Sequence, residues 1–387
     1  MVEAKLIGVG AAGNKAAIEV LEAGVMSERD VYLFNTTEKD IPDKYKDNES
    51  LVHLIDNNNF YGGGSGKEHM RGRKAIVNAI KAGAIDLDAF VNNDSKMVII
   101  VASTEGGTGS GAAPIIAKYY EANGYPVHVF ALVGFQDEGR GIDNTLKFFS
   151  AFGESKLVTI HTILNDRFKD YTESYATAEE AANKEFANQV NILLCNELIP
   201  SKQNIDNTDH YKIISTSGYG VIKHIPLIDV KNIEASNKLI KDAFDNNTCM
   251  DYEEGYGKLV LAVIINASER TLDNIDDRYD VIKRYIGIPY EIFRHIQNDG
   301  SEEYMDVVIA GLPYPEKPIS QLVALKEKIE NAGNRRKSFA DIIGDMGIDD
   351  DDSLDMTDFV RASKETAVEK FEKSIANKKI PFLTSDK

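Results

Sequence analysis

The sequence predicts an α/β protein with a doubly wound parallel sheet, a long central helix, a smaller α/β domain and a helical C-terminal extension. Two observations support this. Short runs rich in Val, Ile and Leu alternate with longer amphipathic stretches, and glycine-rich segments connect them. This alternation is typical of βαβ units. A chain of 387 residues, 43% of them hydrophobic, is large enough for several domains. We expect these at residues 1–172, 173–200, 201–315 and 316–387.

The first domain is expected to contain five buried strands separated by helices. Compact apolar runs predict the strands, and the amphipathic stretches between them predict the helices. The strands are expected at residues 4–9, 31–35, 97–102, 127–133 and 157–164, and the helices at 15–23, 70–82, 112–122 and 145–151.

One long helix is expected over residues 173–199, because this stretch contains no Gly or Pro and ends at Pro200. It would be roughly 38 Å long at about 1.5 Å per residue. A polar loop should follow it. Beyond that loop we expect strands at 221–230, 258–265 and 304–310, and helices at 234–244, 275–285, 319–332 and 360–376. Residues 341–358 contain eight Asp and no basic residue, which favours a solvated linker over a docking element.

The composition argues against several classes of protein. The formal charge of −18, from 62 acidic and 44 basic residues, disfavours direct binding to nucleic acid. Two cysteines, Cys195 and Cys249, are too few for a disulfide framework or a zinc site. There is no apolar run of membrane-spanning length, and the N-terminal residues do not resemble a signal peptide. We therefore expect a cytoplasmic protein without a membrane partner.

The strongest functional signal is the segment Ala102–Pro114, ASTEGGTGSGAAP, which lies between a predicted strand and a predicted helix. Glycines let a backbone approach a ligand closely, and a helix N-terminus favours anions. The hydroxyl groups of Thr108 and Ser110 add hydrogen-bond donors. We therefore interpret the segment as a loop that binds a di- or triphosphate, and the alternative interpretation is a flexible turn.

Two further glycine-rich loops occur in the same domain. The first, Gly8–Gly13, matches the G-x-G-x-x-G pattern of dinucleotide-binding folds. The acidic residue expected after the second strand is absent, because that strand ends in FNTT. The second loop, Gly62–Lys67, fails the P-loop pattern, since Tyr61 replaces the first glycine and Glu68 follows the lysine. It could still wrap a terminal phosphate.

Three such loops without a Walker motif resemble the tubulin/FtsZ GTPases. EGGTGSGAAP is similar to the signature GGGTGTGAAP, with Glu105 in place of the first glycine, and GVGAAGN, FNTT, GFQDEGR and ILNDR resemble further loops of the family in order. In FNTT, Thr37 replaces an aspartate. The resemblance implies GTP/GDP as the nucleotide, with Mg²⁺ at the phosphates, Glu138 at the ribose and Asn183 at the guanine. The implied nucleotide-binding residues are Gly10, Ala11, Ala12, Asn14, Gly63, Gly64, Gly106, Gly107, Thr108, Gly109, Ser110, Glu138, Asn165 and Asn183.

The polar loop after the long helix contains Asn204, Asp206 and Asp209 in the pattern N-x-D-x-x-D. Two carboxylates three residues apart can polarise a water that an amide orients. Taken alone, the segment is typical of an ordinary turn. It also matches the catalytic loop of the tubulin/FtsZ family, which implies that these residues complete the site of the next subunit. Such a contact produces head-to-tail filaments.

The C-terminal extension resembles that of the plasmid- and phage-encoded TubZ group. That resemblance implies a filament that segregates DNA through a small DNA-binding adaptor held by the tail. A cell-division FtsZ is the alternative within the family. The distant alternative is a Rossmann-type NAD(P) oxidoreductase that uses the Gly8–Gly13 loop.

Overall fold

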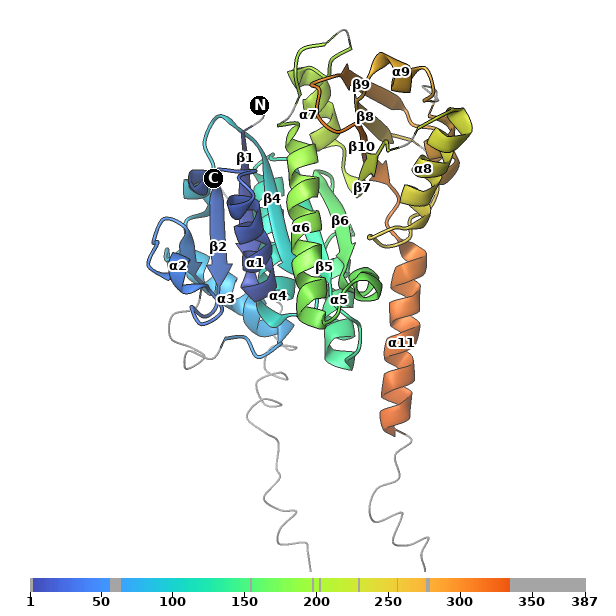
Figure 1. Ribbon diagram of the computed structural model, residues 1–387. Coiled ribbons are helices and arrows are strands. Elements are labelled where there is room, and N and C mark those ends of the chain that lie inside the picture. The colour runs from blue at the N-terminus through green and yellow to red at the C-terminus, as the bar shows by residue number, and fades with distance from the viewer. Residues whose placement is uncertain are drawn as a thin grey trace, which may run out of the picture. The chain divides into compact units, whose positions relative to one another are not determined.

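A ten-stranded sheet runs through the chain in the computed structural model (Figure 1). The structure describes residues 3–55, 64–153, 155–196, 198–201, 203–228, 230–255, 257–275 and 279–334. Met1–Ile329 form one compact unit, and Glu330–Lys387 are a second. The helix predicted at 360–376, the acidic stretch 341–358 and the tail lie outside the described residues.

The strand order of the sheet is β3-β2-β1-β4-β5-β6-β7-β10-β8-β9. Neighbours from β3 to β7 are parallel, as predicted, whereas β10 is antiparallel to both β7 and β8. The strands are β1 (Glu3–Val9), β2 (Val31–Asn35), β3 (Val52–Leu54), β4 (Ser95–Ser103), β5 (Val127–Val133), β6 (Val158–Leu164), β7 (Gly218–Pro226), β8 (Val260–Asn266), β9 (Glu291–Gln297) and β10 (Tyr304–Leu312). The fold class is confirmed, with an antiparallel strand added to the predicted parallel sheet.

Three helices of the first half begin earlier than predicted, each directly after a strand or glycine-rich loop. They start at Gly10, Gly107 and Gly139, about five residues before the apolar periodicity begins. Their first turns are rich in glycine and small polar residues, so they carry no hydrophobic signal. The long helices here are α1 (Gly10–Glu22), α3 (His69–Lys81), α4 (Gly107–Ala122) and α5 (Gly139–Ser150), with a short α2 (Asp43–Lys46).

The central helix, α6 (Tyr175–Leu194), is shorter than the predicted 173–199. It begins at a capping box in which the hydroxyl of Ser174 accepts a hydrogen bond from the backbone N–H of Thr177. It ends at Cys195, whose left-handed φ of 54° stops the helix five residues before Pro200. Its 20 residues span about 30 Å at about 1.5 Å per residue, which corrects the longer estimate.

The second half adds α7 (Asn207–Ser215), α8 (Ile233–Asp245), α9 (Glu269–Leu272), α10 (Asp280–Ile286) and α11 (Glu316–Asn334). Of these, α7 was expected to be loop. None of the helices in the described part of the chain combines the length and apolarity needed to cross a membrane.

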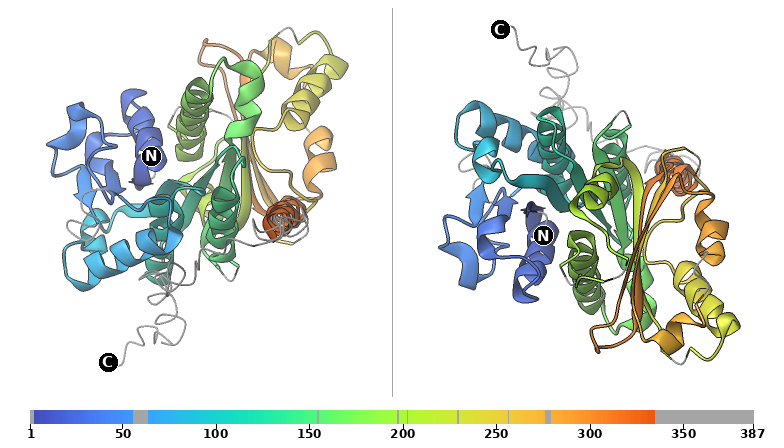
Figure 2. Two further views of the ribbon diagram at one scale, coloured as in Figure 1. Left: turned by 90° about the horizontal axis from the view of Figure 1, so that it is seen from below. Right: turned by 90° about the horizontal axis from the view of Figure 1, so that it is seen from above.

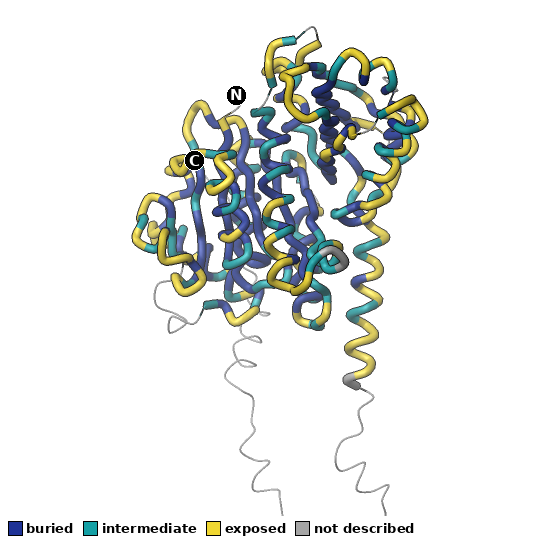
Figure 3. The backbone as a smooth tube through the Cα atoms, in the orientation of Figure 1, coloured by how far each residue is buried: buried dark blue, intermediate teal, exposed yellow. Residues whose placement is uncertain are grey.

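Helices cover both faces of the sheet, as the end-on views in Figure 2 show. Successive strand residues point to opposite faces, so Leu6 packs in the cluster beneath α1 and α6 while Ile7 packs beneath α3, α4 and α5. Figure 3 shows the strands as buried and most connecting loops as exposed. The loops at the strand ends therefore rest on a rigid, close-packed support.

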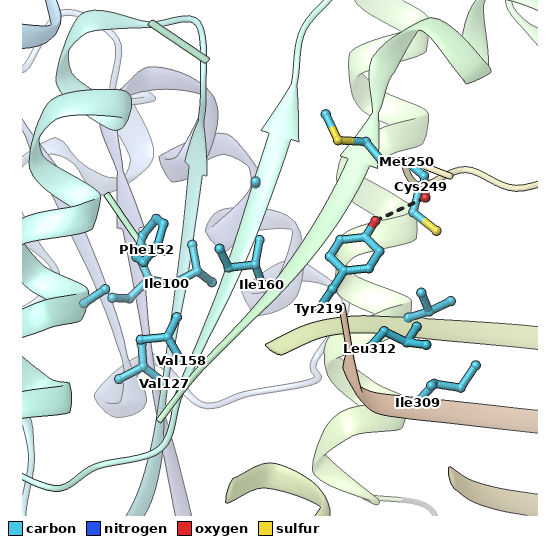
Figure 4. Close-up of a cluster of buried hydrophobic side chains, with 14 of the residues drawn as sticks. Ile100, Val127, Phe152, Val158, Ile160, Tyr219, Cys249, Met250, Ile309 and Leu312 are labelled. Carbon is cyan, nitrogen blue, oxygen red and sulfur yellow. Dashed lines mark hydrogen bonds between the residues drawn. The ribbon is translucent and has the colours of Figure 1, made fainter. Parts of the chain in front are cut away.

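The two halves of the sheet share one core, although β6 and β7 pair through only Thr159–Gly218 and Ile160–Tyr219. Figure 4 shows this core extending from Ile100 and Ile160 past Tyr219 to Leu312. The Tyr219 hydroxyl lies fully within it and donates a hydrogen bond to the carbonyl of Met250 at 3.3 Å. The two halves of the sheet are therefore joined by buried packing around Tyr219 as well as by the short strand pairing.

Candidate nucleotide site

The glycine-rich loops meet around a cavity of about 350 Å³ at the carboxyl ends of β1, β2 and β4. Ligands of open α/β sheets bind at this edge. The described residues that line it are Val9, Gly10, Ala11, Ala12, Asn35, Thr36, Thr37, Lys39, Asp40, Gly64, Ser65, Gly66, Lys67, Ser103, Gly106, Gly107, Thr108 and Gly109. Eight of the predicted nucleotide-binding residues are in this set, and Gly63 lies outside the described residues.

The signature loop forms the first turn of α4, which starts at the cavity. Its N-cap, Gly106, has no side chain to bond the free N–H groups of that turn, so these remain available for an anion. Glycine is required for the packing here. A Cβ on Gly107 would lie 2.5 Å from the backbone nitrogen of Glu68, and one on Gly109 would lie 2.7 Å from the carbonyl oxygen of Ser103.

Three hydroxyl groups tie the loops of the cavity together. The hydroxyl oxygens of Thr36 and Thr108 lie 2.8 Å apart, and Thr108 donates to the hydroxyl of Ser65 at 3.1 Å. These residues come from the ends of β2, the start of α4 and the loop before α3. Of these three residues, only Thr108 was predicted from the sequence to bind. The sequence also marks the segments FNTT and Gly62–Lys67, but no spacing rule singles out Thr36 or Ser65 within them.

A smaller cavity of about 90 Å³ adjoins the first, since Ala12 and Ser103 line both. Its described lining residues are Ala12, Lys15, Ser103, Glu105, Leu132, Gly134, Phe135, Asn165, Glu179 and Asn183. The predicted residues Asn165 and Asn183 therefore lie together here. The buried side-chain oxygen of Asn165 has no hydrogen-bond partner in the described structure. An unsatisfied acceptor of this kind suits a polar planar ligand.

Asn14 and Ser110 were predicted to bind nucleotide, but they are not among the described residues that line either cavity. Both are fully buried. The hydroxyl of Ser110 donates a hydrogen bond to the carbonyl oxygen of Gly106 at 2.5 Å, so it stabilises the signature loop from within. The Asn14 side chain lies against Gly8 at the root of the first loop.

Glu138 also lies outside both sets of described lining residues. Its carboxylate forms an ion pair with the ammonium group of Lys67 at 2.8 Å. Lys67 itself lines the larger cavity and has a positive φ of 61°, which is uncommon for lysine. The sequence excludes a P-loop here and leaves the loop as one that could wrap a terminal phosphate, but Lys67 was not predicted as a binding residue.

The predicted catalytic residues lie at the opposite end of α6 from the cavities, beside α7 in Figure 1. Asp206 is the N-cap of α7, and its Oδ1 accepts hydrogen bonds from the N–H groups of Thr208 and Asp209, both at 2.8 Å. The Asn204 side chain accepts from the N–H of Ser201 at 2.7 Å. Asn204 and Asp206 are exposed to solvent. The structure therefore brings these three residues together, but away from the cavities of the same chain.

No group of three or more His, Cys, Asp or Glu side chains in the described residues could hold a metal by itself. Asp40 is the one carboxylate among the described residues of the larger cavity. Mg²⁺ commonly keeps several waters and takes one or two carboxylates together with substrate phosphates. The residues present therefore fit a magnesium ion that arrives with phosphate.

Residues 3–173 match the family model "Tubulin/FtsZ family, GTPase domain". These residues are a tubulin/FtsZ-family GTPase domain. The GTPase domain holds both cavities except for Glu179 and Asn183 of α6. Its activity is the hydrolysis of GTP to GDP and phosphate, so the oxidoreductase alternative is wrong.

Similar proteins cover more of the chain than the GTPase domain. Cell division protein FtsZ of Aquifex aeolicus is 24% identical over an alignment of 361 residues, and the match covers 87% of this chain and 92% of that protein. The solved structure of TubZ from Clostridium botulinum phage c-st matches with a TM-score of 0.66 at 17% identity, covering 86% of this chain and 100% of that one. CetZ2 from Haloferax volcanii, solved as a GTPγS-bound protofilament, matches with a TM-score of 0.67 at 19% identity, covering 86% of this chain and 99% of that one. The structural likeness extends the shared fold beyond the GTPase domain.

Proposed function

We propose that this chain is a self-assembling GTPase whose subunits stack head to tail, so that each GTP site is completed by the next subunit. One observation carries the proposal. The Asn204–Asp209 segment follows the C-terminal end of α6, whereas Glu179 and Asn183, in the N-terminal half of α6, line the smaller cavity. The helix from Asn183 to its end at Leu194 alone spans about 17 Å at about 1.5 Å per residue. A carboxylate at that distance cannot act on a phosphate in its own chain.

The nucleotide is divided between the two cavities. The backbone N–H groups of Gly10, Ala11, Ala12 and Gly106–Gly109 surround the phosphates, and Gly64 closes the cavity from the side. Asn165 and Asn183 bind the guanine in the smaller cavity. Mg²⁺ bound with the phosphates supplies charge neutralisation during hydrolysis.

The neighbouring subunit supplies Asp206 and Asp209, which polarise the attacking water, and Asn204, which orients it. On the same helix, α7, the side chain of Tyr211 is 47% exposed and offers apolar surface to such a contact.

Contact between different surfaces of identical subunits generates an open filament when the rotation does not close. The GTPγS-bound protofilament of CetZ2 from Haloferax volcanii supports this arrangement for the present fold.

The test measures GTPase rate per subunit against protein concentration, with light scattering followed in parallel and GDP and NAD as controls. We expect both signals to appear together above one threshold concentration, with GTP alone. A GTPase rate per subunit that stays constant on dilution below the threshold would show that a single chain carries the complete site.

We further propose that the filament positions plasmid or phage DNA through a small DNA-binding adaptor bound to residues 361–387. This segment has seven basic and four acidic residues, against a whole-chain charge of −18. Cell division is the second candidate, because the Aquifex aeolicus relative is named cell division protein FtsZ. Removal of residues 361–387 should leave GTP-dependent sedimentation intact and abolish capture of the adaptor encoded beside the gene. Loss of sedimentation would assign the tail to assembly instead.

A further inference from the structure

Glu105 occupies the place of the first glycine in the signature that this chain otherwise resembles. In the structure it lies between the two cavities. Ser103, two residues before it, lines both of them, Glu105 lines the smaller one, and Gly106 lines the larger one. A charged side chain therefore stands at the junction of the candidate phosphate and base sites.

The Glu105 carboxylate is held in a prepared position. Its Oε1 accepts a hydrogen bond from the backbone N–H of Gln136 at 3.0 Å. Space for the group comes from two glycines. A Cβ on Gly134 would lie 2.0 Å from Oε2, and a Cβ on Gly141 would lie 3.1 Å from the carboxyl carbon. A side chain at Gly134 would therefore move the carboxylate out of this position.

Burial raises the pKa of the Glu105 carboxyl, and the nearby Asp137 and Glu138 add to this effect. A partly buried carboxylate beside a phosphate site is unfavourable unless a donor reaches it. In a nucleoside triphosphate the sugar lies between base and phosphates by covalent structure. With phosphates in the larger cavity and the base in the smaller one, the sugar hydroxyls must pass through the junction where Glu105 lies.

Glu138, which the family resemblance places at the ribose, makes a different contact in the structure. It is ion-paired with Lys67 and is not among the described residues lining either cavity. We propose that Glu105 accepts a hydrogen bond from a ribose hydroxyl of the bound nucleotide and thereby selects ribonucleotides over deoxyribonucleotides. This inference rests on the nucleotide site proposed above. Glu105 is then a specificity-determining residue that the glycine of the related signature could not replace.

Equilibrium binding of GTP, 2′-deoxy-GTP and 3′-deoxy-GTP to the full-length protein tests the proposal. In the wild type, 2′-deoxy-GTP should bind about 10- to 100-fold more weakly than GTP, the scale of one hydrogen bond to a charged group, whereas 3′-deoxy-GTP should bind like GTP. In Glu105→Ala the ratio of the GTP affinity to the 2′-deoxy-GTP affinity should fall to about one. The ratio is the decisive quantity, because removal of a negative charge near the phosphates strengthens binding of all three nucleotides equally.

Two further variants serve as a conservative substitution and as a control. Glu105→Gln preserves the shape of the side chain and should reduce the ratio, which gives a readout if Glu105→Ala folds poorly. Asp94→Asn removes an exposed charge just before β4, at the opposite end of that strand from the cavities, and should leave the ratio at the wild-type value. Wild-type binding of GTP with an unchanged ratio in both Glu105 variants would overturn this inference alone. A fall of the ratio to about one in Glu138→Gln, with no change in the Glu105 variants, would also overturn it. Failure of the wild type to bind GTP would instead overturn the proposed nucleotide site itself.

Discussion

The side-chain nitrogen of Asn144 donates a hydrogen bond to the carbonyl oxygen of Glu105 at 2.8 Å. The same nitrogen donates to the carbonyl oxygen of Lys67 at 2.9 Å. One buried amide of α5 therefore joins the signature loop to the loop before α3, and both of these loops line the larger cavity.

Asn144→Ala should weaken both loops at once. Removal of one partner from buried hydrogen bonds costs about 1–3 kcal/mol of unfolding free energy, and GTP affinity should fall with it because the cavity loses its fixed shape. Urea denaturation and equilibrium GTP binding measure the two effects. Asn78→Ala, at an exposed position of α3, is the matched control and should change neither. Equal behaviour of the two variants would remove Asn144 from the support of the site.

Gly109→Ala should destabilise the protein and abolish GTP binding. Its Cβ would lie 2.7 Å from the carbonyl oxygen of Ser103 and 3.1 Å from that of Val9, both at the ends of buried strands. Such overpacking costs about 1–3 kcal/mol. In Gly106→Ala the new Cβ meets no atom within 4 Å, so thermal stability should fall less than in Gly109→Ala, by no more than the cost of a poorer N-cap residue. A normal melting temperature for Gly109→Ala would contradict the packing of the signature loop.

Asp206→Asn should separate two roles of one residue. Asn caps helices as well as Asp does, so α7 should keep its stability, while loss of the carboxylate should lower GTP hydrolysis about 10²-fold. Asp206→Ala should lose the cap as well, at about 0.5–2 kcal/mol. Asp209→Asn should match Asp206→Asn in rate, and all three variants should still bind GTP.

Asn232→Ala, which removes the cap of α8, controls for capping alone and should hydrolyse GTP normally. Wild-type hydrolysis in Asp206→Asn would exclude this carboxylate from the reaction.

The free energy of unfolding should decrease as the pH falls, starting at pH values above those at which most carboxylates become protonated. His128 and His161 are buried against each other, with ring nitrogens 3.0 Å apart. Burial lowers the pKa of His128 from 6.5 to about 4, and that of His161 well below its usual value. Between pH 6.5 and pH 4 the unfolded chain therefore binds more protons than the folded one, so stability is lost as the pH falls through this window.

The measurement is the urea midpoint at pH 7 and at pH 5 in the wild type and in His128→Asn. The variant should show a smaller difference between the two values. An equal difference would place the proton uptake on other groups.

Much of the fold followed from hydrophobic pattern alone. The strands β1, β4 and β5 are almost fully buried apolar runs, and their predicted bounds were accurate to within two residues. β3 has three half-buried residues, and β9 reads EIFRHIQ without a continuous apolar run, so neither gave a signal. α7 was missed for a related reason, since its first turn is the polar segment that follows the Asp206 cap.

The site was predictable where it depends on backbone and not where it depends on side-chain pairs. Glycine spacing located the loops around the larger cavity, because glycine at a strand-to-helix junction has few other uses. The contact of Thr36 with Thr108 joins residues 72 apart, and that of Asn144 with Lys67 joins residues 77 apart. Neither pair has a spacing rule in one sequence. The pairing of Glu138 with Lys67 was hidden for the same reason.

The two hydrogen bonds among the hydroxyl groups of Thr36, Thr108 and Ser65 run in one direction, each hydroxyl donating to the next. Thr108 has one hydroxyl proton and donates it to Ser65, so the proton shared between Thr36 and Thr108 must belong to Thr36. Ser65 accepts and keeps its own proton, which neither bond uses, and it lines the larger cavity. Hydrogen bonds in series polarise one another. The last hydroxyl of the series is thereby a strengthened donor, with the polarity that an anionic oxygen in the larger cavity requires.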